Sequence, residues 1–342
     1  MLTERQKHIL SIVISEYVNS AVPVSSQIIV KISDLGVSSA TIRNELGVLE
    51  DLGYIMHPHT SAGRIPTDKG YRYFVDHLQE REAVSREMAA KVAGIFQERV
   101  KSIDDLMRKA SKLLSSLTDE ASLVVFPKLE MQHFKKVSLI PVDAARLVVV
   151  WISTSGLVWH GSMELDSPTD LETLNRLANF LNSELEGLSF RKMEGVISAK
   201  LRERRDSLAR FYELAVKVIR ESLKVSQELR IFLEGSTNVL GKPEFDDLDK
   251  NRKLLNLFDS KQDLVRLFDE DVHSAGIKVH IGSVGQLKNI SDCSLVTSTY
   301  QLKDDSTGLV GVLGPKRMNY PKVISLVEYM AREMADVLYR YF

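Results

Sequence analysis

Apolar residues recur three or four positions apart over about the first fifty residues, and this spacing predicts helices with one buried face. The first helix would begin after Thr3, which forms the pattern of a capping box with Gln6. A serine at position 25 or 26 can cap a short second helix, and Ser38 can cap a third after a glycine-containing turn. Three helices in this arrangement are typical of a helix-turn-helix.

The third predicted helix, at about residues 39–52, has two different faces. Ile42, Leu46 and Leu49 fall on one side and would be buried. The opposite side has no acidic residue and carries Ala40, Arg43, Asn44 and Gly47. Arginine can bond bidentately to guanine and asparagine to adenine, while small residues let the backbone approach the bases. A solvated helix face would use the same residue types, but the preceding helices favour contact with DNA.

The segment HTSAGR, His59 to Arg64, has no apolar side chain larger than alanine and lies between two short strand-like runs. Its place after a helix-turn-helix predicts the wing of a winged helix, which lies along the DNA backbone or in the minor groove. The contacting residues would be Thr60, Ser61, Gly63 and Arg64 in this loop, and Ser39 and Thr41 for phosphates at the third helix. The alternative is an exposed connector without a partner.

The rest of the chain mixes helical and strand-like patterns. A helix after Thr67 would close the first domain near residue 80, and residues 83–119 predict a connecting helix. Strand-like runs that would begin an antiparallel sheet follow at 123–126, 137–140, 147–152 and 157–160. Charged helical stretches at 199–227 and 251–270 interrupt this sheet. It would resume with the runs at 278–282, 294–300 and 309–313, before a closing helix at about 321–341.

Composition narrows the class of protein. The chain has 342 residues, of which 44% are hydrophobic and 27% charged, and this predicts two or three folded domains. It shows no signal-peptide pattern at its start and no apolar run of membrane-spanning length, so we expect a cytoplasmic protein without a membrane partner. Residues 1–80 contain seven Lys and Arg against nine Asp and Glu, a charge of −2. DNA binding would therefore rely on a small contact face present in two copies.

Patterns of catalytic or metal sites are weak. The pair His57 and His59 has no third ligand nearby, and the glycines before Lys316 lack the spacing of a Walker loop. The acidic run 244–249 fits a solvated loop, and the single Cys293 fits a small buried side chain. We find no Ser-His-Asp or Cys-His set, and we expect neither an enzyme nor a bound cofactor or metal.

The runs SSATIRNEL, LEDLGYI and HTSAGRIPTDKGYRYFVDHL together resemble the heat-inducible transcription repressor family HrcA. The similarity continues through CSLVTSTYQ and GVLGPKRMNYPKVI, with one departure at Ser25, where the family commonly has glycine. The resemblance implies a dimeric repressor that binds an inverted-repeat operator, the CIRCE element, upstream of chaperone genes. It also implies that the chaperonin GroEL maintains the active form.

The resemblance further implies an α+β multidomain architecture: an N-terminal winged helix-turn-helix and a GAF-like α+β domain with an inserted helical dimerisation segment. The chain would divide into a DNA-binding domain at 1–80, a connecting helix at 81–120, the GAF-like domain at 121–185 and 271–342, and the inserted segment at 186–270. One alternative is a winged-helix regulator whose GAF-like domain binds a small effector. Another is an enzyme with a DNA-targeting domain, which would need a catalytic cluster that we do not find in the second half.

Overall fold

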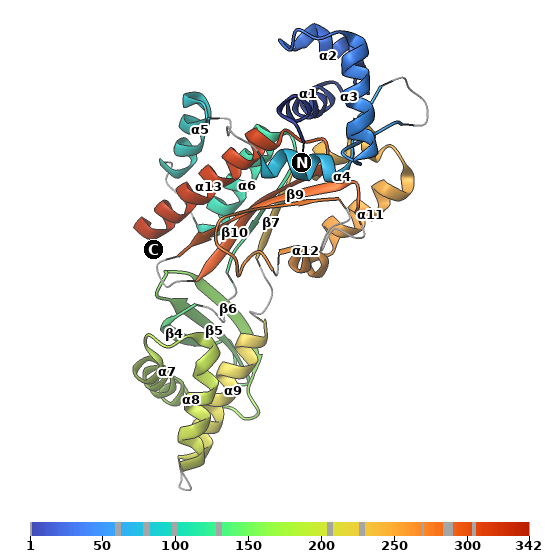
Figure 1. The fold of residues 1–342 in the computed structure, drawn as a ribbon. Helices are drawn as coiled ribbons and strands as arrows, with labels where there is room; N and C mark the ends of the chain where they lie inside the picture. Colours follow the sequence, from blue (N-terminus) through green and yellow to red (C-terminus); the bar gives the residue numbers. More distant parts are fainter. Residues whose placement is uncertain are drawn as a thin grey trace.

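The computed structural model describes residues 2–58, 63–77, 83–97, 102–127, 132–203, 208–225, 230–268, 270–282, 290–302 and 306–341. These residues form an α+β protein in three parts: an N-terminal helical unit, a central sheet with helices on both faces, and a second lobe with its own sheet (Figure 1). None of the described helices combines the length and the apolar character that crossing a bilayer requires.

The N-terminal unit contains the helices that the apolar spacing predicts. Its elements are α1 (Glu4–Ser20), α2 (Ser26–Ile32), α3 (Ser39–Asp51), the strands β1 (Ile55–Met56) and β2 (Ile65–Pro66), and α4 (Asp68–Asp76). Thr3 makes both bonds of the predicted capping box, and Ser25 and Ser38 each accept from the third backbone N–H of their helix. The core between α1 and α3 consists of Ile9, Leu10, Val13, Ile14, Ile42, Leu46 and Leu49.

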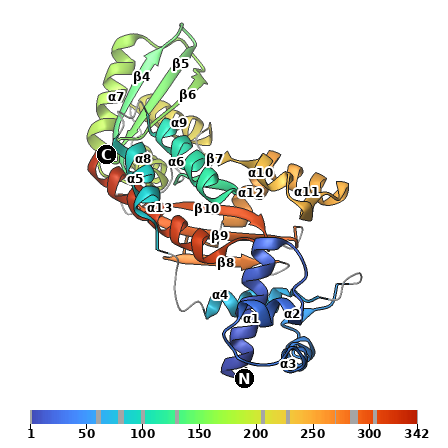
Figure 2. The same ribbon diagram turned by 90° about the horizontal axis from the view of Figure 1, so that it is seen from above.

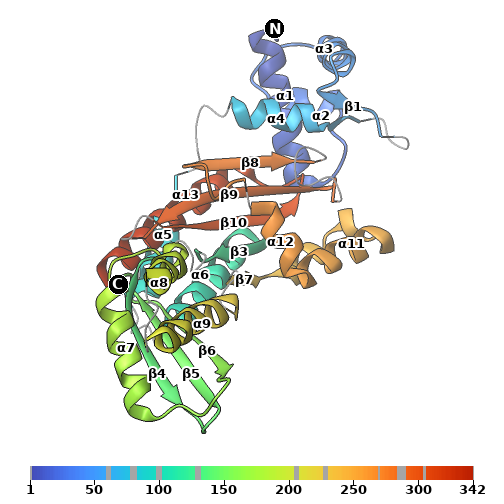
Figure 3. The ribbon, with the colours of Figure 1, turned by 90° about the horizontal axis from the view of Figure 1, so that it is seen from below.

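The central sheet is antiparallel and runs in the order β7-β3-β10-β9-β8 (Figure 2 and Figure 3). Its strands are β3 (Ala121–Val125), β7 (Ile231–Glu234), β8 (Ile277–Ile281), β9 (Cys293–Gln301) and β10 (Thr307–Pro315). Successive residues of β3 are buried on opposite faces, as the two-residue period of a strand requires. Val124 belongs to the core under α6 (Ile103–Thr118) and α13 (Tyr320–Tyr341). Leu123 and Val125 belong to the core with α10 (Ser236–Leu240), α11 (Leu248–Asp259) and α12 (Lys261–Phe268).

Two local predictions in this sheet are confirmed. Gly308 and its neighbouring glycines lie inside β10 rather than in a phosphate-binding loop, and a Cβ at Gly308 would lie 2.2 Å from the Tyr300 ring. Cys293 is fully buried at the start of β9, and burial raises the pKa of its thiol. A small side chain in the core is therefore the role of this cysteine.

The strands of the second lobe do not belong to the sheet that the sequence predicted for them. β4 (Phe134–Pro141), β5 (Arg146–Ser153) and β6 (Val158–Glu164) pair only with one another, and α7 (Leu171–Leu185), α8 (Phe190–Glu203) and α9 (Ala209–Val225) accompany them (Figure 3). Of the four runs expected to begin the sheet that resumes near residue 278, only β3 joins it. That expectation was wrong because an apolar alternation identifies a strand but not its partner.

The predicted connecting helix at 83–119 also needs correction. The described part of this stretch contains α5 (Arg86–Gln97) and α6, which pack against one another and against α13. One side of α6 is buried against the central sheet through Ile103, Leu106, Met107, Ala110 and Leu114. α6 is therefore part of the central domain and not a spacer outside it.

A buried carboxyl group lies between α6 and β3. Glu120 is 3% exposed, and its Oε1 lies 2.6 Å from Lys242 Nζ, while Oε2 has no hydrogen-bond partner among the described residues. Burial raises the pKa of Glu120 from its ordinary 4.5 to about 7. Lys242 acts in the opposite direction, and Asp119 and Glu244 add to the increase. The fold thus favours the protonated form more than water does.

Glu120→Gln should change how the stability of the protein depends on pH. A native pKa of about 7 against an ordinary 4.5 means that the contribution of Glu120 to stability is present below that range and is lost as pH rises through it. The amide of glutamine does not titrate and has no such loss. The free energy of unfolding of the variant should therefore rise relative to that of the parent by up to about 3 kcal/mol between about pH 5 and about pH 8. Urea unfolding across this pH range measures the difference.

Glu186→Gln, at an exposed glutamate at the end of α7, provides the matched control and should follow the parent at each pH. A constant difference between Glu120→Gln and the parent across the range would contradict the assignment.

Candidate nucleic-acid interface

α3 lies on the outer side of the N-terminal unit, away from the central sheet (Figure 3). Its predicted outer face is exposed at Ala40, Arg43 and Asn44 and half-buried at Gly47, while Ile42, Leu46 and Leu49 are buried on the other side. The two-faced interpretation of this helix is confirmed. Within the described part of the chain, the side chains of Arg43 and Asn44 form no hydrogen bond or ion pair with another residue.

Two carboxylates of α3 are occupied by neighbouring groups. Glu45 lies 3.6 Å from Arg5 and accepts a hydrogen bond of 3.0 Å from Gln6, both on α1. Glu50 lies 2.8 Å from the guanidinium of Arg64 at β2. These pairs reduce the repulsion that α3 would otherwise exert on phosphate groups.

Two hydroxyl groups at the start of α3 already have a partner each, one on α2 and one at the cap of α3 itself. Ser39 Oγ lies 3.0 Å from Ser26 Oγ at the start of α2, and Thr41 Oγ1 lies 3.0 Å from the capping Ser38 Oγ. A hydroxyl has one donor and two acceptor positions, so each can take a further bond. Contact of Ser39 and Thr41 with phosphate remains a prediction.

The two-stranded ribbon expected after α3 is present. Ile55 pairs with Pro66 and Met56 with Ile65, antiparallel. Thr60 and Ser61, predicted at its tip, lie outside the described residues, as does His59. Gly63 and Arg64 lie at its base instead, where the backbone groups of Arg64 and Val24 exchange two hydrogen bonds of 2.9 Å.

Arg64 faces the protein in this structure. Its side chain is 15% exposed, and it pairs with Glu50 and forms a hydrogen bond with the His57 ring. These contacts attach the base of the β1–β2 ribbon to the C-terminal half of α3. They support a structural role, and the predicted contact of Arg64 with DNA remains untested.

The two predicted site glycines differ in what surrounds them. Gly63 does not have a positive φ, but a Cβ there would lie 2.5 Å from the carbonyl carbon and oxygen of Pro23. Gly47 has nothing within 4 Å of the position of a Cβ. Close packing of the protein therefore requires glycine at 63, whereas the glycine at 47 leaves open space on the outer face of α3.

Two exposed apolar side chains near this face were not identified from the sequence as candidate DNA contacts. Val48 is 42% exposed one helical turn after Asn44, and Met56 is 45% exposed on β1. Apolar side chains at such positions suit contact with a thymine methyl group. The spacing of four from Asn44 identifies Val48, but no local pattern identifies Met56.

Alanine in place of each of the two glycines should change the stability of the N-terminal unit in opposite directions. Gly63→Ala should destabilise the N-terminal unit by about 1 to 3 kcal/mol, because the methyl group overlaps the Pro23 backbone. Gly47→Ala should stabilise α3 by about 0.5 to 1 kcal/mol, because glycine is costly inside a helix and the site is open. Hydrogen exchange of the α1 and α3 amides measures both changes. Effects of the same sign would contradict these environments.

The fold and this surface define a class of protein. An α+β body that carries a helical unit, with Arg and Asn exposed between small residues on one helix, is characteristic of a transcription regulator. Residues 104–324 match the family described as HrcA protein C terminal domain. The chain therefore belongs to the heat-inducible transcription repressor HrcA family and is a transcriptional repressor of the heat-shock response.

Individual relatives agree with this assignment. The chain is 34% identical to the heat-inducible transcription repressor HrcA of Bacillus pumilus strain SAFR-032, over 99% of this chain and 98% of that protein. It is 36% identical to the repressor of the same name from Pelotomaculum thermopropionicum, over 99% and 97%. A crystal structure of a hypothetical protein at 2.2 Å resolution superposes with a TM-score of 0.62 at 25% identity, covering 99% of both chains.

Proposed function

We propose that this repressor occupies an inverted-repeat operator of the CIRCE type upstream of chaperone genes. In this proposal α1–α3 and the β1–β2 ribbon form a winged helix-turn-helix, and α3 enters the major groove. The observation that carries it is the outer face of α3, where the side chains of Arg43 and Asn44 are exposed and have no partner among the described residues. Arg43 would read guanine and Asn44 adenine, with Ala40 and Gly47 allowing close approach.

Phosphate contacts would come from two places around this face. Ser39 and Thr41 lie at the N-terminus of α3, where free backbone N–H groups also favour an anion. The wing would add Thr60 and Ser61 at its tip, while Gly63 and Arg64 hold its base. These contacts would set the register of the helix on the duplex.

The active form would be a homodimer. Residues 1–80 have a charge of −2, so a single copy offers little general attraction to DNA. The central sheet would be the GAF-like domain, and we place the inserted dimerisation segment at 134–225 rather than 186–270, because these residues form the separate lobe. Exposed apolar side chains on this lobe support self-association: Ile140, Val142, Val158 and Leu171.

Control of this cytoplasmic repressor would come from the chaperonin GroEL, which maintains the form that binds DNA. The second candidate is a small effector, favoured by a cavity of about 590 Å³ between the N-terminal unit and the central domain, lined by Tyr17, Asp68, Tyr71, Lys250 and Lys316. Operator binding measured with added chaperonin and, separately, with a panel of metabolites distinguishes the two. A response to metabolites alone would favour the effector.

Arg43→Ala and Asn44→Ala should each weaken binding to the operator by about 1 to 3 kcal/mol, because each removes a base contact. The thermal melt should change little, since both side chains are exposed. Fluorescence anisotropy on operator and on random DNA measures the effect. Arg252→Ala, at an exposed arginine of α11 outside the proposed dimerisation segment, is the matched control and should bind as the parent does. Equal losses on both DNAs would assign the residue to phosphate contact.

The proposed dimer makes a prediction about the operator itself. Two identical recognition helices require half-sites that present the same face of DNA, about one helical turn or a multiple of it apart. Inserting about five base pairs between the half-sites turns one of them to the opposite side and should abolish tight binding. A gel-shift titration of both operators measures this. Unchanged affinity would indicate monomers that bind independently.

A further inference from the structure

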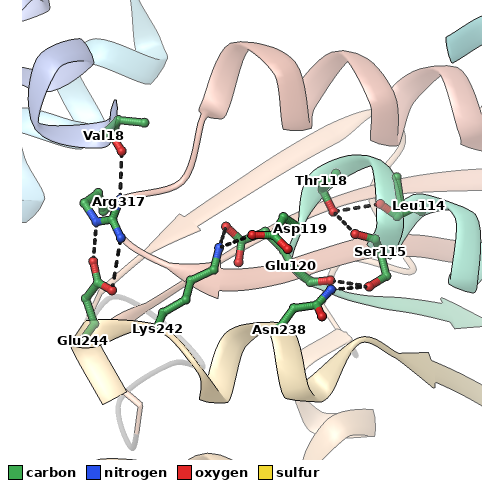
Figure 4. Close-up of polar contacts among 10 residues, drawn as sticks. All are labelled: Val18, Leu114, Ser115, Thr118, Asp119, Glu120, Asn238, Lys242, Glu244 and Arg317. Carbon is green, nitrogen blue, oxygen red and sulfur yellow. Dashed lines mark hydrogen bonds and ion pairs between the residues drawn. The ribbon is translucent and has the colours of Figure 1, made fainter. Parts of the chain in front are cut away.

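The C-terminal end of α1 is capped by an arginine side chain from a distant part of the chain. The last carbonyl groups of a helix have no partner within it, and a positive charge there is favourable. The last turn of α1 contains no basic residue. Arg317, in the turn between β10 and α13, donates a hydrogen bond of 2.8 Å from Nη1 to the carbonyl oxygen of Val18 (Figure 4). The central domain thus caps a helix of the N-terminal unit.

Arg317 is held in place by a carboxylate of the central domain. Its Nε donates to Glu244 Oε1, and its Nη2 lies 3.5 Å from Glu244 Oε2. The two side chains are only 16% and 23% exposed. Charge-assisted bonds to both carboxylate oxygens restrict the guanidinium to one orientation. We call the set of Val18, Arg317 and Glu244 the interdomain clasp.

Glu244 is itself fixed by its neighbours in the chain. Lys242 pairs with the buried Glu120, and Asn238 donates a hydrogen bond of 3.2 Å to Ser115 Oγ on α6 (Figure 4). Phe245, the next residue, is buried in the core with α11 and α12. The carboxylate that holds Arg317 is therefore part of the rigid central domain.

The turn that carries Arg317 makes a second contact with the N-terminal unit. Lys316 pairs with Asp68 at the start of α4. The backbone of this turn is held by Tyr320, whose hydroxyl donates to the Lys316 carbonyl at 2.8 Å and lies 2.7 Å from Ser294 Oγ. Two successive cations of one rigid turn thus contact both α1 and α4.

We propose that Arg317 is a positioning residue for operator binding. It fixes the C-terminus of α1 on the central domain, and α1 packs against α3, so the clasp sets the direction of the recognition helix relative to the body of the protein. In a dimer this direction determines the separation of the two recognition helices. The inference rests on the proposed function, because the separation matters only if two half-sites are bound at once.

The test compares binding to operators of different spacing. Arg317→Met removes the charge and the donors but keeps an apolar stem, and Arg317→Met combined with Glu244→Gln also removes the carboxylate left unpaired. Arg332→Met, at an exposed arginine of α13, is the matched control. Each protein is titrated with the operator, with operators whose half-sites are moved by about one to three base pairs, and with a single half-site.

The parent and the control should prefer the native spacing. In the Arg317 variants, the ratio of the affinity for the native spacing to that for an altered spacing should fall by about tenfold to a hundredfold. This is the factor expected for a lost charge-assisted hydrogen bond. Their affinity for a single half-site should equal that of the parent, because the face of α3 is unchanged. Arg317→Lys should restore part of the preference, since an ammonium group can bond to only one of the two partners well.

A second measurement does not depend on DNA. Spin labels at Val30→Cys on α2 and Asp336→Cys on α13 report the distance between the N-terminal unit and the central domain, and the native Cys293 is buried and should not react. Dilution with unlabelled protein removes distances between subunits. The distance distribution should be narrow in the parent and the control, and broad in Arg317→Met.

The outcomes separate the two hypotheses. An unchanged spacing preference in Arg317→Met overturns the positioning role. An equal loss on the operator and on the single half-site also overturns it, because that result shows damage within the N-terminal unit. If the parent binds the operator no better than random DNA, the proposed function fails, and the distance distribution then decides whether Arg317 orients the N-terminal unit.

Discussion

The pairing of β10 with two strands from distant parts of the chain is the constraint on which the rest of the structure depends. β10 pairs along its length with β9, its neighbour in sequence, and on its other edge with β3, which lies almost two hundred residues earlier. This pairing buries β3 on both faces, and the lobe at 134–225 is inserted in the sequence between β3 and β7 of the same sheet. The turn after β10 then carries Lys316 and Arg317 to the N-terminal unit.

The N-terminal unit and the central domain meet through polar contacts as well as through apolar contacts such as that of Tyr71 with Tyr320. Within the N-terminal unit, α1 and α3 share an apolar core that excludes water and defines one packing. The polar contacts between them include the ion pair of Lys316 with Asp68 and the hydrogen bond from Arg317 to the Val18 carbonyl, which are directional and partly exposed. Such contacts set an orientation but contribute modestly to stability. The fold of the N-terminal unit and its direction on the central domain thus depend on different sets of contacts.

The candidate site shows why some residues were predicted well and others were not. The outer face of α3 follows from the local period of a helix and from the apolar stripe of Ile42, Leu46 and Leu49. Arg64 was predicted as a DNA contact from its place in a polar loop, but its side chain pairs with Glu50, on another element. Gly63 was predicted as a DNA contact in the same loop, and the structure shows close packing of this glycine on Pro23. Contacts of this kind join segments that no local pattern connects.

The sequence by itself determined the helices of the N-terminal unit and their caps, the two faces of α3, and the strand pattern of β3, β9 and β10. It also determined the family, through runs such as SSATIRNEL. These features depend on residues within a few positions of one another, where backbone geometry repeats with a known period. Only the tertiary structure decided that β4–β6 form a separate sheet, that α6 is part of the central core, and that Arg317 caps α1. These features depend on which distant segments meet, because strand partners and ion pairs are chosen by the packing of the whole chain.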